Sequence, residues 1–223
     1  MPFAKGVWVL LQREYGLLLR GEYGEGEVCA FTGGVSMQDR LHRIIENHPV
    51  IPALKDDRGL QAVLNSDFQI VFILYGSISD IGEITEKVKR SGKMAFVNVD
   101  LIEGFANKEI VIQYMKKYTA AEGILSGKAS MIKAAREQGF YTVHRLFVID
   151  SFSFDNLDRQ IEISRPDYLE ILPGWPKLVT WVMEKTDIPI ISGGLICCKE
   201  DAIAALKAGA VAVCSTNPEV WSA

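Results

Sequence analysis

The sequence predicts an α/β fold, a (β/α)8 TIM-like barrel with a short N-terminal β-rich extension. From about residue 48, short apolar runs rich in β-branched residues alternate with longer amphipathic stretches. This alternation is typical of buried parallel strands and the helices that cover them. The apolar runs number eight, the count that closes such a barrel. They are residues 49–54, 69–75, 93–100, 122–126, 141–150, 167–172, 188–192 and 210–215.

The stretches between these runs have the apolar spacing of helices. In residues 81–88, Ile, Ile and Val recur three or four positions apart, which places them on one helix face. Gly92, Gly139 and Gly209 follow three of these stretches, where a residue with left-handed backbone commonly ends a helix. An open doubly wound sheet is the alternative fold. It would need a Gly-rich loop after its first strand, and residues 53–56 read Ala-Leu-Lys-Asp.

The N-terminal part of the chain does not fit this alternation. We therefore divide the sequence into an extension, residues 1–44, and a barrel domain, residues 45–223. Residues 6–31 read as two or three short β-runs with Gly turns, which form either an appended hairpin or a poorly ordered extension. A third interpretation is that residues 33–37 are a ribosome-binding sequence read as codons, with Met37 as the natural start.

Composition and charge restrict the class of protein. The net charge of −4 argues against a general polyanion-binding protein, although it leaves room for a local basic patch. No apolar run approaches the roughly 20 residues that cross a bilayer, and the start of the chain lacks the pattern of a signal peptide. We therefore expect a cytoplasmic protein without a membrane partner. The cysteines have no CxxC spacing and no histidines cluster with them, so we expect no metal site.

Two donor-rich loops follow the last two predicted strands. Gly193 and Gly194 come directly after the seventh run, and Ser215 and Thr216 end the eighth. In a (β/α)8 barrel the loops after strands seven and eight commonly form an anion site. Glycine lets backbone N–H groups approach an anion, and hydroxyl groups add donors. The sequence therefore predicts a phosphate site here, although two tight turns would give the same pattern.

Charged residues lie at several other predicted strand ends. Asp100 ends the third run, Lys128 follows the fourth, and Lys55 follows the first. Arg145 and Glu170 lie within the fifth and sixth runs, and a buried charge is costly unless it is paired. We expect these two residues either to pair with each other or to meet a ligand. His144 alternates opposite to Arg145 and is predicted to face the helices.

Several stretches of the sequence resemble the glycerol uptake operon antiterminator family. The resemblance runs from about residue 45 to the C-terminus. The stretches that carry it are HPVIPALKDDRGL, VNVDLIEGFANKE, GILSGKASMIKAAREQG, RLFVIDSFSFDN, RPDYLEILPG and IPIISGGLICCKEDAIAALKAGAVAVCSTNPEVW.

The resemblance implies a bacterial cytosolic regulator with a barrel fold and no catalytic role. It implies an effector, glycerol 3-phosphate, and a partner, the leader of a glycerol-metabolism messenger RNA, on which the protein prevents termination. One departure is Gly127, where the family pattern has Thr, so that one hydroxyl donor is lost. The family motifs fall on Asp100, Glu103, Lys128, Arg145, Asp150, Glu170, Gly193, Gly194, Ser215 and Thr216.

Two basic spots are candidates for RNA contact. Lys133 and Arg136 nearly share one face of a predicted helix, and Lys116 and Lys117 lie on another. Such lysines are also common on solvated helix faces, and a homodimer would double the basic surface. The alternative function is an enzyme of the isomerase, synthase or lyase type acting on a small phosphorylated metabolite, because many such enzymes share this barrel. A barrel that binds ligand without RNA is a third reading.

Overall fold

The computed structural model describes residues 37–222, in which eight parallel strands close into a barrel in chain order. The eighth strand pairs with the first through Ile51 and Cys214. Each predicted apolar run coincides with one strand, although the seventh strand extends one residue further, to Gly193, so the barrel fold is confirmed. The strands are β1 (Val50–Leu54), β2 (Ile70–Ile73), β3 (Met94–Asn98), β4 (Gly123–Ser126), β5 (Tyr141–Phe147), β6 (Tyr168–Leu172), β7 (Ile190–Gly193) and β8 (Ala212–Ser215).

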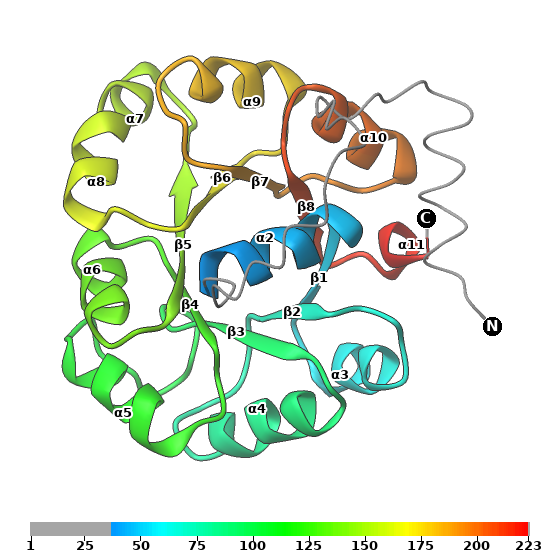
Figure 1. Ribbon diagram of the computed structural model, residues 1–223, viewed down its shortest axis with the longest axis vertical. Helices are drawn as coiled ribbons and strands as arrows, with labels where there is room; N and C mark the ends of the chain where they lie inside the picture. The colour runs from blue at the N-terminus through cyan, green and yellow to red at the C-terminus, as the bar shows by residue number, and fades with distance from the viewer. Residues whose placement is uncertain (1–36, 223) are drawn as a thin grey trace, which may run out of the picture.

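Helices surround the barrel as a ring (Figure 1). Gly92, Gly139 and Gly209 have φ values of +80°, +75° and +108°, which supports their predicted role after helix ends. The outer helices are α3 (Asp57–Leu64), α4 (Ile81–Arg90), α5 (Ile110–Tyr118), α6 (Ala129–Glu137), α7 (Ser151–Asp155), α8 (Leu157–Ser164), α9 (Pro176–Met183), α10 (Lys199–Lys207) and α11 (Pro218–Trp221).

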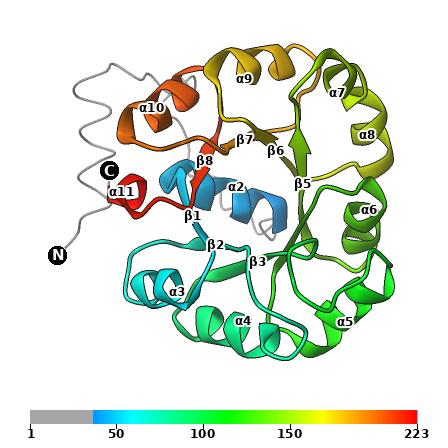
Figure 2. The ribbon, with the colours of Figure 1, turned by 180° about the vertical axis from the view of Figure 1, so that it is seen from behind.

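One further helix, α2 (Met37–Asn47), lies across the barrel rather than around it. It occupies the centre of the ring in both views (Figures 1 and 2). Leu41 and Ile45 are buried in one apolar cluster with Tyr141 and Tyr168, which are the first residues of β5 and β6. Helix α2 therefore closes the end of the barrel at which the strands begin.

Helix α2 differs from the sequence-based expectation for this segment. Residues 37–44 were placed in a β-rich extension, whereas they form most of a helix that belongs to the barrel core. The physical reason is that Leu41 and Ile45, four residues apart, present one apolar face to the open end of the barrel. The short β-runs expected within residues 6–31 lie outside the described residues.

Aromatic rings fill the barrel interior near α2. The ring centroids of Phe72 and Phe96 lie 5.7 Å apart, and those of Phe96 and Tyr141 lie 6.1 Å apart. Glycine is required at position 123, because a Cβ atom there would lie 2.1 Å from the Phe96 ring. Towards the other end of the barrel, interior positions become polar, and Glu170 and Arg145 take the place of the rings.

Candidate ligand site at the barrel mouth

A buried ion pair forms the floor of the barrel mouth. The strand register places Arg145 on β5 beside Glu170 on β6, and Arg145 Nε lies 3.6 Å from Glu170 Oε2. The Glu170 side chain is 1% exposed and that of Arg145 is 16% exposed. The pairing expected from the sequence is therefore confirmed.

The ion pair leaves hydrogen-bonding capacity unused. A separation of 3.6 Å is an ion pair but is too long for a hydrogen bond. Arg145 Nη1 and Glu170 Oε2 are both buried and have no hydrogen-bond partner among the described residues. Unmade hydrogen bonds of buried polar groups are costly.

The surroundings of Glu170 shift the pKa of its carboxyl group. Burial raises the pKa of Glu170, while the positive charge of Arg145 and a hydrogen bond with Cys214 act in the opposite direction. Burial, followed by the charge of Glu170, raises the pKa of the Cys214 thiol, so this cysteine stays a thiol. At Gly193 a Cβ atom would lie 2.6 Å from Glu170 Oε1. Gly193 therefore makes room for the Glu170 carboxyl group.

The loops after β7 and β8 lie side by side. Gly193 and Cys214 are register partners at the ends of these strands. Ser215 Oγ donates to the Ile196 carbonyl at 2.7 Å. The structure thus brings together the two loops that the sequence singled out, next to the ion pair on the floor.

Backbone conformation in the β7 loop is unusual. Gly194 has φ +71° and the following Leu195 has φ +59°, and such left-handed backbone is uncommon for Leu and often marks functional sites. Gly194 directly follows β7, and Thr216 directly follows β8. Their N–H groups therefore lie at the carboxyl ends of two neighbouring strands.

The two predicted hydroxyl groups have different surroundings. The Ser215 hydroxyl donates to Ile196 and accepts from the Asn217 N–H at 3.1 Å, so its proton is engaged within the protein. Thr216 is exposed. It lies two residues after Cys214, so strand alternation places both side chains on the same side of the chain, towards the barrel interior. Sequence alternation alone did not reveal that Ser215 links the two loops.

Asp100 organises the loop after β4. Its carboxylate accepts hydrogen bonds from Ser126 Oγ at 2.9 Å and from the Gly127 N–H at 2.6 Å. The backbone N–H of Lys128, the residue before α6, donates to Ser126 Oγ at 3.1 Å. Asp100 therefore holds the start of α6 in place, in addition to any contact with a ligand.

Two lysines complete the set of predicted mouth residues. Lys55 follows β1 and is exposed, whereas Lys128 is half-buried. Neither forms an ion pair with an acidic residue in the described ranges. Because both follow strand ends, they lie at the same end of the barrel as Arg145.

His144 faces away from the barrel interior, as expected. Its Nδ1 atom lies 2.9 Å from Ser164 Oγ on α8. Burial lowers the pKa of His144 to about 4, although the Gly127 backbone and the Asp100 charge act in the opposite direction. The ring is therefore neutral near pH 7.

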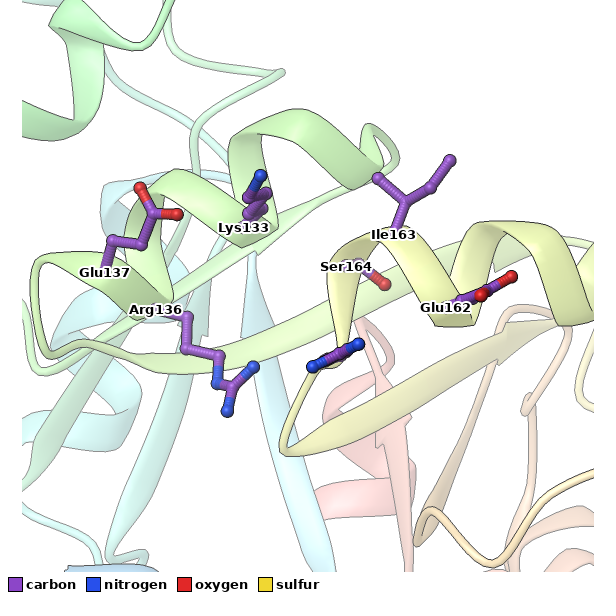
Figure 3. Close-up of a pocket in the computed structure, with 7 residues that line it drawn as sticks. Lys133, Arg136, Glu137, Glu162, Ile163 and Ser164 are labelled. Atoms are coloured by element: carbon purple, nitrogen blue, oxygen red, sulfur yellow. The ribbon is translucent and has the colours of Figure 1, made fainter.

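The predicted RNA residues lie on the outer helices. Lys133 and Arg136 line a groove of about 640 Å³ between α6 and α8, and Arg165 lines it as well (Figure 3). Lys116 Nζ lies 4.9 Å from the Phe140 ring centroid, and Lys117 Nζ lies 5.0 Å from that of Tyr118. Sequence reasoning missed Arg165 because it is far from α6 along the chain.

The described residues contain neither a candidate metal site nor a membrane-spanning helix. No group of three or more His, Cys, Asp or Glu side chains in residues 37–222 could hold a metal ion. None of the helices in this range has the length and apolar character needed to cross a membrane.

Comparison with known proteins identifies the family. A family model described as glycerol-3-phosphate responsive antiterminator matches residues 50–221. The chain belongs to this family. The match spans all eight strands, so the recognition made from the sequence motifs is confirmed. The family is regulatory and is described by its response to glycerol 3-phosphate.

Similar proteins support this assignment. The chain is 51% identical over 183 residues to an uncharacterized protein, YgcP, of Escherichia coli strain K12, covering 82% of this chain and 96% of that protein. A solved glycerol uptake operon antiterminator regulatory protein from Listeria monocytogenes is 28% identical, with a TM-score of 0.76 over 78% of this chain and 95% of that one. A related protein from Thermotoga maritima is also 28% identical, with a TM-score of 0.69 over 78% and 98% of the two chains.

Proposed function

We propose that this antiterminator family member binds glycerol 3-phosphate in the barrel mouth and, with this effector bound, binds the leader of a glycerol-metabolism messenger RNA. It thereby prevents termination of transcription, in the cytoplasm where the transcript is made. The observation that carries the proposal is the buried Arg145–Glu170 pair, whose free hydrogen-bonding atoms lie beside the β7 and β8 loops.

Each part of the effector has a matching group in the mouth. The phosphate accepts hydrogen bonds from the N–H groups of Gly194 and Thr216, because backbone donors near the ends of neighbouring strands favour anions. The hydroxyl groups reach Arg145 and Glu170, which supply a free donor and a free acceptor. Lys55 and Lys128 at the rim balance the remaining negative charge, and Asp100 positions the loop that carries Lys128.

Effector binding acts by shifting the protein between two states. A ligand shifts such an equilibrium only by the difference in its affinity for the two states. Here the difference in affinity comes from two effects. The mouth loops become ordered around the phosphate, and the unpaired hydrogen-bonding atoms of Arg145 and Glu170 gain partners. The RNA-competent state is the one in which these loops are ordered. A homodimer would present the RNA-binding surface twice.

An enzyme acting on a small phosphorylated metabolite is the second candidate function. The observation that favours it is Glu170, a buried acid with a raised pKa, since such a group can serve as a general base. The neighbouring His144 is turned towards α8 and gives no acid to complement it at the mouth. Family membership favours the regulator.

The two candidates differ in one experiment. The RNA probe is transcribed from the leader of the glycerol-metabolism gene nearest to the gene of this protein. Retention of the probe is measured at several salt concentrations with glycerol 3-phosphate, glycerol or inorganic phosphate. The regulator requires binding at least about 10-fold tighter with glycerol 3-phosphate than with the other two, within the usual range of allosteric coupling. Equal binding in all three, together with turnover of a phosphorylated triose, would establish the enzyme.

A further inference from the structure

Charge is distributed unevenly between the two rims of the barrel. Most outer helices lead from the end of one strand back to the start of the next. The first turns of these helices therefore lie towards the mouth, and their last turns lie towards the end closed by α2. Acidic residues occupy first turns of α3, α4, α8, α10 and α11. Basic residues occupy last turns of α4, α5, α6 and α10.

This arrangement of charges complements the helix macrodipoles, and it also affects where a polyanion can approach the barrel. Acids near helix starts and bases near helix ends are each stabilising. The same arrangement repels a polyanion from the rim of the mouth and attracts it to the opposite rim. Macrodipoles alone explain isolated lysines, so a nucleic-acid site needs a further observation.

The groove between α6 and α8 provides that observation. Lys133 and Arg136 on α6 and Arg165 after α8 line it, and all three are exposed. None of them forms an ion pair with an acidic residue within residues 37–222. Arg136 extends from α6 towards the end of α8 (Figure 3). Three cations without an ion-pair partner among the described residues, together with the acids Glu137 and Glu162, therefore line one concave surface.

Helix α4 shows the opposite arrangement at the same rim. Lys87 Nζ lies 2.8 Å from Glu83 Oε1, and Arg90 Nε lies 2.9 Å from Glu86 Oε1. These two cations are neutralised by acids of their own helix. The contrast with α6 shows that a basic residue in a last turn is not always available to a partner.

We infer that the α6–α8 groove binds the phosphate backbone of the RNA, at the side of the barrel and away from the effector mouth. This inference rests on the proposed function. Arg165 enters it from the structure alone, because its left-handed backbone, with φ +43°, ends α8 and turns the chain at the groove. Lys116 and Lys117 at the end of the neighbouring α5 extend the basic surface along the same rim.

The groove and the mouth share structural elements. Helix α6 begins directly after Lys128, whose N–H bonds to the Ser126 hydroxyl held by Asp100. Helix α8 is fastened to the barrel by Ser164, which lies 2.9 Å from His144, the neighbour of Arg145 on β5. These hydrogen bonds connect the mouth loops to both walls of the groove.

The decisive variant removes the three cations together, as Lys133→Gln, Arg136→Gln and Arg165→Asn. Asn is chosen because it tolerates left-handed backbone. With saturating glycerol 3-phosphate, we expect affinity for the leader RNA to fall at least about 10-fold, and the slope of log affinity against log salt to shrink by about 2, since each lost contact to single-stranded RNA removes about 0.7. Calorimetric affinity for glycerol 3-phosphate stays unchanged.

Two further variants make the test independent of folding. Lys87→Gln with Arg90→Gln removes the paired cations of α4 and leaves RNA affinity unchanged. Glu137→Gln with Glu162→Gln removes the acids that line the groove and tightens RNA binding about 2- to 5-fold, the range expected for surface charges. A damaged fold would not tighten binding.

The outcomes separate this inference from the proposed function. If the wild-type protein binds the leader RNA in response to glycerol 3-phosphate but the triple variant keeps the same affinity and salt slope, the groove is not the RNA site and the proposed function survives. If the α4 variant weakens binding as much as the triple variant does, the contact is a diffuse one and the inference is overturned. If the wild-type protein binds no leader RNA at all, the proposed function itself fails.

Discussion

The two ends of the barrel differ in the residues that fill their interior. At the end closed by α2, interior positions hold the packed rings of Phe72, Phe96 and Tyr141. At the mouth, the corresponding positions hold Arg145 and Glu170, which keep unsatisfied polar atoms. One end thus supplies stability, whereas the other gives up stability to keep a polar floor, which we propose serves a ligand. Four experiments test this difference, from the largest expected effect to the smallest.

Phe96→Ala removes the central ring at the closed end. We expect it to lower the free energy of unfolding by about 3–5 kcal/mol, because a large cavity opens in a tightly packed layer. Denaturant titration followed by circular dichroism measures this loss. Arg145→Met combined with Glu170→Leu, which removes both charges of the buried pair, is the matched change at the mouth and should cost far less stability. An equal loss from both would remove the distinction between the two ends.

His144 makes stability depend on pH. Its pKa is lowered from 6.5 to about 4 in the folded protein, mainly by burial, so the unfolded chain binds the proton more tightly. Stability is therefore complete above pH 6.5 and is lost as pH falls towards 4, by up to roughly 3 kcal/mol. In His144→Gln this part of the pH dependence should vanish. Denaturant midpoints between pH 4 and pH 7 measure it, and parallel profiles for both proteins would contradict the assignment.

Arg145→Met tests the floor of the mouth as a binding group. The variant keeps a long side chain and loses the charge, so we expect affinity for glycerol 3-phosphate to fall at least 10-fold, as is usual for a hydrogen bond to a charged group worth about 1.5–3 kcal/mol. Isothermal titration calorimetry measures the change. Lys87→Met on α4 is the control for loss of a positive charge far from the mouth. Undiminished binding in Arg145→Met would place the ligand elsewhere.

Thr216→Val tests the rim, where we expect the smallest effect. The exposed hydroxyl is lost without a change of shape, so affinity for glycerol 3-phosphate should fall only about 3-fold and stability should not change. Ser215→Ala should do the reverse, because its hydroxyl joins the β7 and β8 loops. We expect it to cost about 1 kcal/mol of stability. The two variants exchange roles if the ligand contacts Ser215 instead.

The sequence predicted the elements that repeat and missed those that bring distant segments together. Eight apolar runs were enough to find the strands, and alternation along β5 correctly turned His144 outward and Arg145 inward. Helix α2 was missed because its apolar face, which includes Leu41 and Ile45, is short. This face is buried only when the helix packs on the open end of the barrel, and the sequence of the helix does not show that contact.

Contacts between loops were equally hidden in the sequence. The engagement of Ser215 with Ile196 depends on how two loops fold together, and strand alternation does not encode it. Arg165 joins Lys133 and Arg136 only after α6 and α8 pack side by side.

Substitution of Gly194 is unsuitable as a test of phosphate binding. Its φ is +71°, and a Cβ atom there would lie 2.9 Å from the Leu172 side chain.

A crystal structure of the protein with glycerol 3-phosphate tests the central claim most directly. We predict that the phosphate lies within hydrogen-bonding distance of the Gly194 and Thr216 N–H groups, and that a hydroxyl group of the ligand meets Arg145 Nη1 or Glu170 Oε2. A ligand bound outside the mouth, or one whose phosphate is turned away from both loops, would contradict the account.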